Sequence, residues 1–252
     1  MGRDQKIKHR YGLIGKDISY SFSERYFKEK FNKLDLDSYK YQNFDIDTIE
    51  KFIGIIKKTK NLKGLNVTIP YKEAVLDYLD EIDEKAAKIG AVNTIKILKN
   101  GRLKGFNTDV YGFQKSIGQH LKKHHQKALI LGTGGASKGV IFVLKKMNIK
   151  VLSVSRNPDK RDEISYDDVS ESIINEYSII VNCSPVGTHP NTEEYPNIPY
   201  QYLTSRHLMF DLIYNPSRTL FLKKGLEKGS TICNGLLMLE LQAEKAWEIW
   251  NS

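Results

Sequence analysis

The chain has 252 residues, 40% of them hydrophobic, and a formal net charge of +9. This length and apolar content suit two modest domains or one large one, and they exclude a disordered chain. No stretch is long and apolar enough to span a membrane, and residues 1–6 lack the apolar run of a signal peptide, so we predict a cytoplasmic protein without a membrane partner. The basic residues form separate pairs typical of solvated helix faces, such as Lys57 and Lys58, which predicts no nucleic-acid partner.

The first part of the chain alternates apolar strands with amphipathic helices, which is typical of an α/β fold. Strands are predicted near Arg10–Ile14, Tyr39–Phe44, Gly64–Ile69 and Val92–Leu98, and helices near Ser23–Leu34, Thr48–Lys58, Tyr71–Leu79 and Glu81–Ile89.

The second part begins at a helix predicted over Asp109–Gly118. Strands near Leu129, Val151, Ile179, Leu208 and Ile232 and helices near Ala136–Met147 and Thr219–Lys228 predict a second, parallel sheet, followed by a last helix over Leu236–Trp250.

A lysine follows the third predicted strand in the sequence Gly-Leu-Asn-Val-Thr-Ile-Pro-Tyr-Lys, residues 64–72. Asn66 and Thr68 at the end of this strand can hydrogen-bond a polyol. Lysine can exchange a proton near neutral pH when it is desolvated, which makes Lys72 a catalytic candidate. The alternative is a solvated lysine that opens the following helix.

Two turns of small residues present further polar side chains, Asn93 in Gly-Ala-Val-Asn-Thr and Asp109 in Asn-Thr-Asp. A carboxylate at the start of a helix is stabilised by the helix dipole and stays ionised beside an ammonium group. Asp109 can therefore form a proton relay with Lys72. In the alternative, Asp109 only caps its helix and Asn93 only closes a turn.

A glycine-rich loop follows the strand Lys127–Leu131 and precedes a helix and a second strand, Lys150–Ser155. This order is the context of a dinucleotide cradle, in which backbone N–H groups approach a pyrophosphate at the helix N-terminus. The predicted cradle consists of Gly132, Thr133, Gly134, Gly135 and Ala136.

The end of the second strand selects the cofactor, because an acid there binds the ribose 2′-hydroxyl and an arginine accommodates a 2′-phosphate. The residues are Ser155, Arg156 and Asn157, and no acid occurs before Asp159. The sequence therefore predicts NADP.

The remaining candidates for metal or redox chemistry are few. His120, His124 and His125 lie among lysines and are interpreted as a solvated helix end, and no metal is predicted. Cys183 and Cys233, the two cysteines, lie near strand ends and are predicted to be free thiols.

Ordered motifs over nearly the whole chain resemble those of the shikimate dehydrogenase family, which interconverts 3-dehydroshikimate and shikimate with NADP. They are residues 21–23, 66–72, 90–94, 107–109, the loop from Gly132 with residues 155–157, Asp211-Leu-Ile-Tyr-Asn-Pro and Gly235-Leu-Leu-Met-Leu-Glu-Leu-Gln. The resemblance implies a substrate domain (1–108 with 236–252), a Rossmann-type NADP domain (109–235) and an active site in the cleft between them, in a monomer or a homodimer.

The resemblance also implies roles for individual residues. Lys72 would be the acid/base group with Asp109, Ser21 and Ser23 would bind the substrate carboxylate, and Leu212 would lie beside the nicotinamide. Further substrate contacts would come from Asn66, Thr68, Asn93, Tyr214 and Gln242, and Gly235 would belong to the cofactor site.

The first motif departs from the family pattern while keeping both serines. Asp17 and Glu24 stand where the family has proline, and Tyr20 and Tyr26 are further departures. This predicts an altered loop and an altered affinity, with the chemistry preserved. Two alternatives stay open: a dehydrogenase for quinate or another cyclitol carboxylate that uses NAD or NADP, and a catalytically silent NADP-binding protein.

Overall fold

In the computed structural model, the protein is described for residues 7–19 and 21–252, so the predictions for residues 1–6 and for Tyr20 lie outside the described residues. The chain forms two compact units. Unit 1 comprises Met1–Thr108 with Ala243–Ser252, and unit 2 comprises Asp109–Gln242. The long helix α8 (Leu236–Asn251) begins in unit 2 and ends in unit 1.

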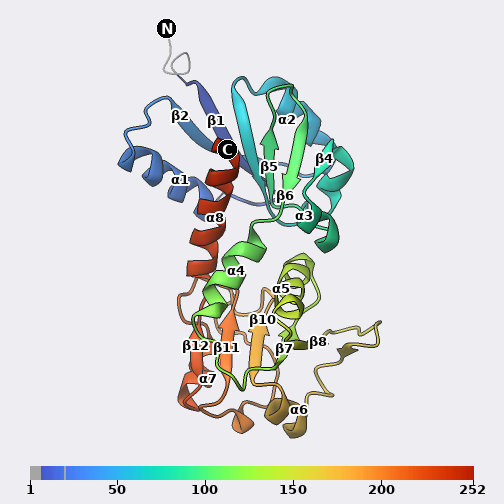
Figure 1. Ribbon diagram of the computed structural model, residues 1–252. Coiled ribbons are helices and arrows are strands. Elements are labelled where there is room, and N and C mark those ends of the chain that lie inside the picture. Colours follow the sequence, from blue (N-terminus) through green and yellow to red (C-terminus); the bar gives the residue numbers. More distant parts are fainter. Residues whose placement is uncertain (1–6, 20) are drawn as a thin grey trace. The chain divides into compact units, whose positions relative to one another are not determined.

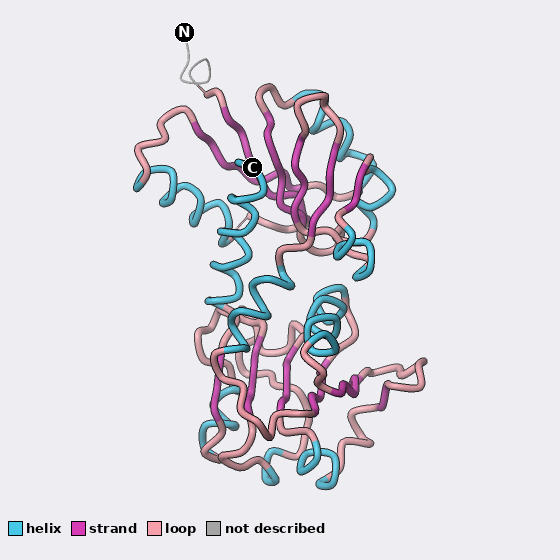
Figure 2. The backbone as a smooth tube through the Cα atoms, viewed as in Figure 1, coloured by secondary structure: helices cyan, strands magenta, loops and turns pink. Residues whose placement is uncertain are grey.

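Unit 1 contains a mixed six-stranded sheet with helices (Figures 1 and 2). Its elements are β1 (His9–Gly15), α1 (Phe22–Lys33), β2 (Tyr39–Asp45), the 3₁₀ helix η2 (Ile49–Lys51), α2 (Phe52–Lys58), β3 (Leu62–Val67), the 3₁₀ helix η3 (Ala74–Tyr78), β4 (Glu81–Ile82), α3 (Glu84–Ile89), β5 (Thr94–Ile97) and β6 (Leu103–Phe106). The strand order is β2-β1-β3-β5-β6-β4. Strand β5 is antiparallel to both of its neighbours, and the other pairs are parallel.

Aromatic residues attach the end of α8 to the sheet of unit 1. The rings of Tyr11 and Trp250 stack with centroids 4.8 Å apart, and the ring centroids of Phe27 and Trp250 are 5.3 Å apart. The Trp250 indole N–H donates a hydrogen bond of 2.9 Å to the carbonyl of Ile95 on β5. Aromatic pairs add to the stability gained from buried area, so residues 243–252 are an integral part of this core.

Two predicted helices of unit 1 were wrong in part. The segment predicted as a helix over 71–79 is a turn followed by η3, because the Lys72 carbonyl accepts from Val92 N (2.7 Å) and Leu76 N donates to Glu73. Helix α3 starts only at Glu84, since Asp83 caps it by accepting from Lys85 N at 3.0 Å, and the preceding residues form β4. Tertiary hydrogen bonds and a cap overrode the local pattern in these two places.

Unit 2 contains a six-stranded sheet in which every pair is parallel, as predicted. Its elements are α4 (Asp109–Gly118), β7 (Lys127–Leu131), α5 (Gly135–Lys146), β8 (Lys150–Val154), β9 (Glu163–Ile164), α6 (Glu171–Glu176), β10 (Ile179–Asn182), the 3₁₀ helix η4 (Tyr200–Tyr202), β11 (Leu208–Asp211), α7 (Leu220–Glu227) and β12 (Thr231–Cys233). The strand order β9-β8-β7-β10-β11-β12 is that of a Rossmann dinucleotide-binding fold. Helix α5 packs on β7 and β8, and α7 packs on β11 and β12.

The histidine prediction was wrong, because α4 ends at Gly118 and His125 is buried. The Nδ1 atom of His125 accepts from Lys122 N at 3.0 Å, and its Nε2 lies 3.0 Å from the Arg206 carbonyl. Burial is the main cause that lowers the pKa of His125. A neutral ring therefore joins the segments that precede β7 and β11.

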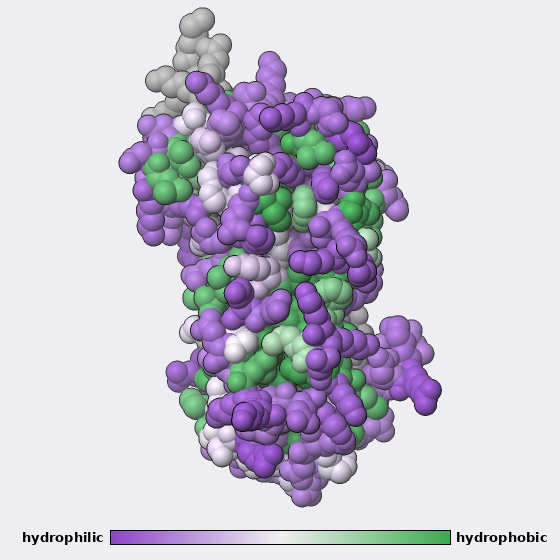
Figure 3. Space-filling view, in the orientation of Figure 1, coloured by the Kyte–Doolittle hydropathy of each residue, from purple (hydrophilic) through white to green (hydrophobic). Residues whose placement is uncertain are grey.

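The surfaces of both units are mostly hydrophilic on the face shown in Figure 3, with small apolar areas between polar side chains. Among the described residues, no helix is both long and apolar enough to cross a membrane. The two cysteines are free thiols, as predicted, and burial raises the pKa of each.

Candidate dinucleotide and substrate sites

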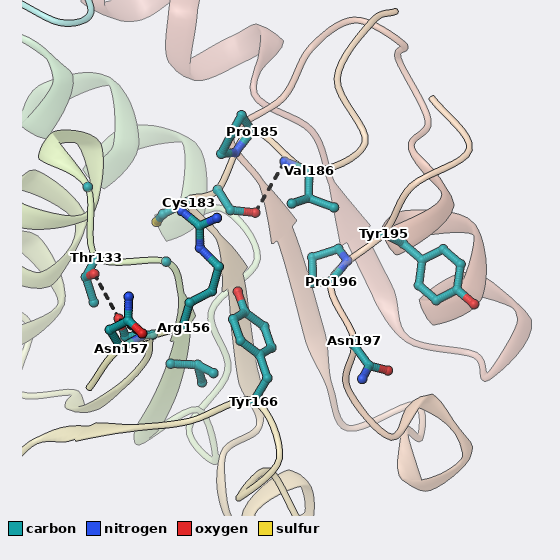
Figure 4. A pocket seen from close by; sticks show the side chains of 15 residues that line it. Thr133, Arg156, Asn157, Tyr166, Cys183, Pro185, Val186, Tyr195, Pro196 and Asn197 are labelled. Atoms are coloured by element: carbon teal, nitrogen blue, oxygen red, sulfur yellow. Dashed lines mark hydrogen bonds between the residues drawn. The ribbon is translucent and has the colours of Figure 1, made fainter. Parts of the chain in front are cut away.

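A cavity of about 820 Å³ lies in unit 2 beside the carboxyl ends of β7, β8 and β10 (Figure 4). Its volume is within the range of small-molecule sites. The carboxyl ends of neighbouring parallel strands are where ligands bind in open α/β sheets. The lining residues are Gly132–Gly134, Val154–Asn157, Tyr166, Cys183–Val186 and Tyr195–Asn197.

The glycine-rich loop has the backbone of a phosphate cradle. Gly132 has φ of 99°, and a Cβ atom there would lie 3.3 Å from Ser184, which follows the neighbouring strand β10. Gly134 precedes α5 in an extended conformation, and the Ser137 hydroxyl donates to its carbonyl at 2.7 Å. The first N–H groups of this 12-residue helix have no acceptor within the helix and are directed to the loop that precedes it. Gly135 and Ala136 form this first turn, outside the pocket lining.

The strand end predicted to select the cofactor lines the same pocket. The Ser155 hydroxyl accepts from Asn157 N at 3.3 Å and lies 3.4 Å from the Thr133 hydroxyl, which joins the turn after β8 to the glycine loop. The exposed Arg156 extends its guanidinium group towards the pocket (Figure 4). Of the described residues that line the pocket, none is acidic, and no described carboxylate forms a salt bridge with Arg156.

A buried carboxylate, Asp211, connects the ends of β10 and β11. Asp211 accepts from Thr219 Oγ1 (2.6 Å), Asn182 Nδ2 (3.1 Å) and Ile213 N (3.1 Å). Asn182 in turn accepts from the backbone N and the hydroxyl of Ser184 at 3.0 and 2.6 Å. Sequence reasoning assigned no role to these polar residues, although Asn182 directly follows a run of buried apolar residues.

Asp211 gives a pH-dependent contribution to stability that can be isolated. Burial raises the pKa of Asp211 from 3.8 to about 6, although its three hydrogen bonds oppose the shift. The folded protein therefore binds this proton more tightly than the unfolded chain, and stability from this group is lost as pH rises from about 4 to about 6. Two pKa units correspond to about 3 kcal/mol. We expect the free energy of unfolding of Asp211→Asn, relative to wild type, to increase by about this amount from about pH 4 to about pH 7.

Urea unfolding of both proteins at the two pH values checks this expectation. The subtraction cancels the titration of the other groups. A difference between variant and wild type that does not change with pH would show that Asp211 titrates normally in the folded protein.

The structure brings together Leu212 and Gly235, which the resemblance placed in the cofactor site, and Tyr214 follows two residues after Leu212. Leu212 N donates to Asn182 at 3.0 Å and Gly235 N donates to Ile213 at 3.0 Å. A Cβ atom on Gly235 would lie 2.1 Å from the Leu212 carbonyl oxygen, so only glycine permits this approach. These residues are outside the lining of the 820 Å³ cavity.

A buried polar cluster in unit 1 is centred on Asn93. Its Oδ1 atom accepts from Thr108 N at 2.7 Å and from the Thr94 hydroxyl at 3.1 Å, while its Nδ2 donates to the Thr108 hydroxyl at 3.1 Å. Its backbone carbonyl accepts from Val67 N at 2.8 Å. The cluster fixes Thr108, and Asp109 follows directly as the first residue of α4.

The same cluster holds the segment that carries Lys72. Asn66 is buried, accepting from the Tyr41 hydroxyl at 2.8 Å and donating to the Thr94 hydroxyl at 3.2 Å. The Lys72 carbonyl accepts from Val92 N, next to Asn93. Thr68 and Lys72 are both partly exposed. The structure gives Asn66 a positioning role, and its contact with substrate stays a prediction.

The two serines of the first motif lie at the start of α1. The Ser21 hydroxyl caps the helix by accepting from Glu24 N at 3.1 Å. Ser23 is buried and hydrogen-bonds to Tyr41, whose pKa is raised mainly by burial. Through Tyr41 and Asn66, Ser23 is connected to the Asn93 cluster.

The departures in the first motif have structural consequences. Asp17 has φ of 57°, which proline could not adopt, so this loop differs from one with proline at that position. The carboxylate of Asp45 holds the loop by accepting from Asp17 N and Ile18 N at 3.0 and 3.2 Å. Glu24 accepts from Asn43 Nδ2 at 2.6 Å, and the Tyr26 hydroxyl donates to Glu244 on α8.

Gln242, the last residue of unit 2, is a buried side chain of α8. Its Nε2 atom donates to the Leu239 carbonyl at 2.9 Å. Each unit thus positions its own share of the predicted substrate residues. Gln242, Tyr214 and Asp109 belong to unit 2, and the others belong to unit 1.

Three features of unit 2 define its class: the strand order of its parallel sheet, the glycine cradle, and an arginine at the end of the second strand of that sheet, β8. They are those of a Rossmann-type dinucleotide-binding protein. Residues 13–95 match the family model of the shikimate dehydrogenase substrate binding domain. The chain belongs to the shikimate dehydrogenase family, as the following relatives show.

A shikimate dehydrogenase (NADP(+)) from Methanosphaera stadtmanae is 38% identical over 257 residues, covering 95% of this chain and 90% of the relative. The crystal structure of shikimate dehydrogenase 1 from Peptoclostridium difficile is similar with a TM-score of 0.84 and 38% identity, covering 96% of this chain and 91% of that one. The Thermus thermophilus enzyme in complex with NADP(H) and shikimate gives a TM-score of 0.84 at 29% identity, covering 96% and 92%. The resemblance inferred from the motifs is confirmed.

Proposed function

We propose that this protein catalyses the reversible, NADP-dependent reduction of 3-dehydroshikimate to shikimate, in the biosynthesis of chorismate and aromatic amino acids. Unit 1 supplies Lys72 and most of the substrate residues, and unit 2 binds the dinucleotide and supplies Asp109, Tyr214 and Gln242. The observation that carries the proposal is the Asn93 cluster, which holds the Lys72 segment and Thr108 in one hydrogen-bonded group. The cytoplasmic location and the monomeric or dimeric state stay predictions.

The residues of unit 2 fit NADP. Gly132 has a positive φ that favours glycine, and no atom of the described residues beyond its chain neighbours lies within 4 Å of a Cβ position on Gly134, which directly precedes α5. The N-terminus of α5 beside this open space suits a pyrophosphate. Arg156 supplies positive charge for the 2′-phosphate, in a pocket whose described lining has no acid to bind a free 2′-hydroxyl. Bound NADPH would supply the hydride for the ring ketone.

The chain's own residues supply the proton and the orientation. Lys72 donates a proton to the carbonyl oxygen as it becomes a hydroxyl, and it takes the proton back in the oxidative direction. Asp109 stabilises the ammonium charge and accepts a hydrogen bond from a neighbouring hydroxyl of the substrate. Ser21 and Ser23 bind the carboxylate, while Thr68, Asn93, Tyr214 and Gln242 hold the ring and its hydroxyls, with Asn66 keeping the cluster in place.

Arg156 should determine cofactor preference. We expect Arg156→Ala to weaken NADPH binding by about tenfold or more, because a charge-assisted contact with the 2′-phosphate is lost, and to leave NADH binding within about twofold. Dissociation constants from the fluorescence of the bound reduced cofactors check this. Arg206→Ala, a change in an exposed arginine outside the pocket lining, is the matched control. Equal weakening of both cofactors would contradict the assignment.

The reductive reaction tests the proposed function directly. Purified protein with 3-dehydroshikimate and NADPH should consume NADPH and form shikimate in equal amounts, measured by absorbance and by chromatography. Protein that binds NADPH but consumes none with this substrate would contradict the proposal.

A further inference from the structure

One residue that lines the dinucleotide pocket, Tyr166, has no role in the proposed function so far. Tyr166 lines the pocket together with Arg156, and it follows the short strand β9. Strand β9 pairs in parallel with β8, and Ser155 N donates to the Ile164 carbonyl at 2.9 Å. This pairing places the turn that carries Tyr166 next to the turn that carries Arg156.

The backbone of Tyr166 is fixed by a closed turn. The Asp168 carboxylate accepts from Ser165 N at 3.0 Å and from the Ser165 hydroxyl at 2.6 Å, and the same hydroxyl accepts from Asp168 N at 3.3 Å. The ring of Tyr166 packs against the hydrophobic core of unit 2 and is partly buried. Its hydroxyl end projects into the pocket (Figure 4).

The chemistry of the two side chains is complementary to a phosphate monoester. Burial raises the pKa of Tyr166, and the nearby Arg156 charge opposes part of this shift, so the phenol is a neutral donor at physiological pH. In the part of the chain that the structure describes, no group forms a hydrogen bond with the Tyr166 hydroxyl. The neutral Tyr166 hydroxyl and the Arg156 guanidinium can both donate to one anionic phosphate. Hydrogen bonds to a charged acceptor are stronger than those between neutral groups.

We propose that Tyr166 is a specificity residue for the cofactor, whose hydroxyl donates a hydrogen bond to the ribose 2′-phosphate that Arg156 binds. The inference rests on the proposed NADP-dependent function and deepens it. Since NAD carries a 2′-hydroxyl instead of the phosphate, the Tyr166 hydroxyl contributes little to NAD binding. Tyr166 and Arg156, which follow the adjacent strands β9 and β8, thus both bind the 2′-phosphate and together distinguish NADP from NAD.

The experiment compares Tyr166→Phe with wild type, because this change removes the hydroxyl and keeps the ring in the core. Tyr202→Phe is the matched control, since Tyr202 packs against the same core and is outside the pocket lining. The probes are NADPH and NADH, followed by fluorescence, and the fragments adenosine 2′,5′-bisphosphate and 5′-AMP, followed by calorimetry.

We expect Tyr166→Phe to weaken NADPH and the bisphosphate by about tenfold, the effect of losing one hydrogen bond to a charged group. NADH and 5′-AMP should change by less than about twofold, and Tyr202→Phe should change nothing. Unaltered NADPH binding, or equal weakening of NADPH and NADH, would overturn the inference and leave the proposed function standing. A wild-type protein that binds neither NADPH nor the bisphosphate would overturn both.

Discussion

Replacing Lys72 by alanine is expected to lower kcat for shikimate oxidation by about 10²- to 10⁴-fold, the usual contribution of a general acid or base. The fold should persist, because the hydrogen bond that fixes this segment uses the Lys72 backbone carbonyl, which alanine retains. NADPH binding should stay within about twofold of wild type, since the cofactor residues belong to unit 2. Steady-state rates and cofactor titrations measure both quantities.

Lys72→Arg separates proton transfer from charge. Arginine keeps the positive charge but does not release its proton near neutral pH, so this variant should be nearly as slow as Lys72→Ala. Lys63→Ala, which removes an exposed lysine of β3, should retain wild-type rates. An Arg variant or an Ala variant with unaltered turnover would eliminate Lys72 as the proton donor.

Asn93→Ala should lower the stability of unit 1 strongly. It removes the acceptor of Thr108 N and of the Thr94 hydroxyl and the donor to the Thr108 hydroxyl, all in a buried cluster. Buried polar groups left without partners cost about 1–3 kcal/mol each, so we expect a loss of about 3 kcal/mol or more in the free energy of unfolding. Turnover should fall as well, because Thr108 directly precedes Asp109.

A graded series tests this explanation by urea unfolding and steady-state kinetics. Thr108→Val keeps the backbone bond to Asn93 and removes only the hydroxyl, so it should cost about 1 kcal/mol. Asn32→Ala changes an exposed asparagine of α1 and serves as the control, with an expected change below about 0.5 kcal/mol. If Asn93→Ala lowers the free energy of unfolding no more than the control does, the cluster does not stabilise unit 1.

Local sequence signals were sufficient where an element's pattern agrees with its tertiary surroundings. Helix α4 covers the predicted residues 109–118, and β7 covers the predicted residues 127–131. The glycine loop and Arg156 were found because each has a known position relative to a strand and a helix, and the structure places both in one pocket. The parallel direction of the strands in the second sheet was predicted from the alternation of strands and helices.

Tertiary contacts decided the features that the sequence did not predict. The two residues of β9 are too few to show a period, so the position of Tyr166 could be known only from the pairing with β8. His125 looked solvated among lysines, and it is buried because its ring joins two loops. The hydrogen bond between Asp211 and Asn182 could not be predicted, because it depends on the pairing of β10 with β11.

The most direct test of the central claim is the rate of nicotinamide reduction with shikimate or quinate, each offered with NADP and with NAD, at mildly alkaline pH. Four initial rates are compared on the same folded protein. Fast reduction only with shikimate and NADP is the expected result, because it requires the Asn93 cluster, Lys72 and the dinucleotide pocket with Arg156 together. Preference for quinate or for NAD, or no reduction by protein that binds NADP, would contradict the proposed function.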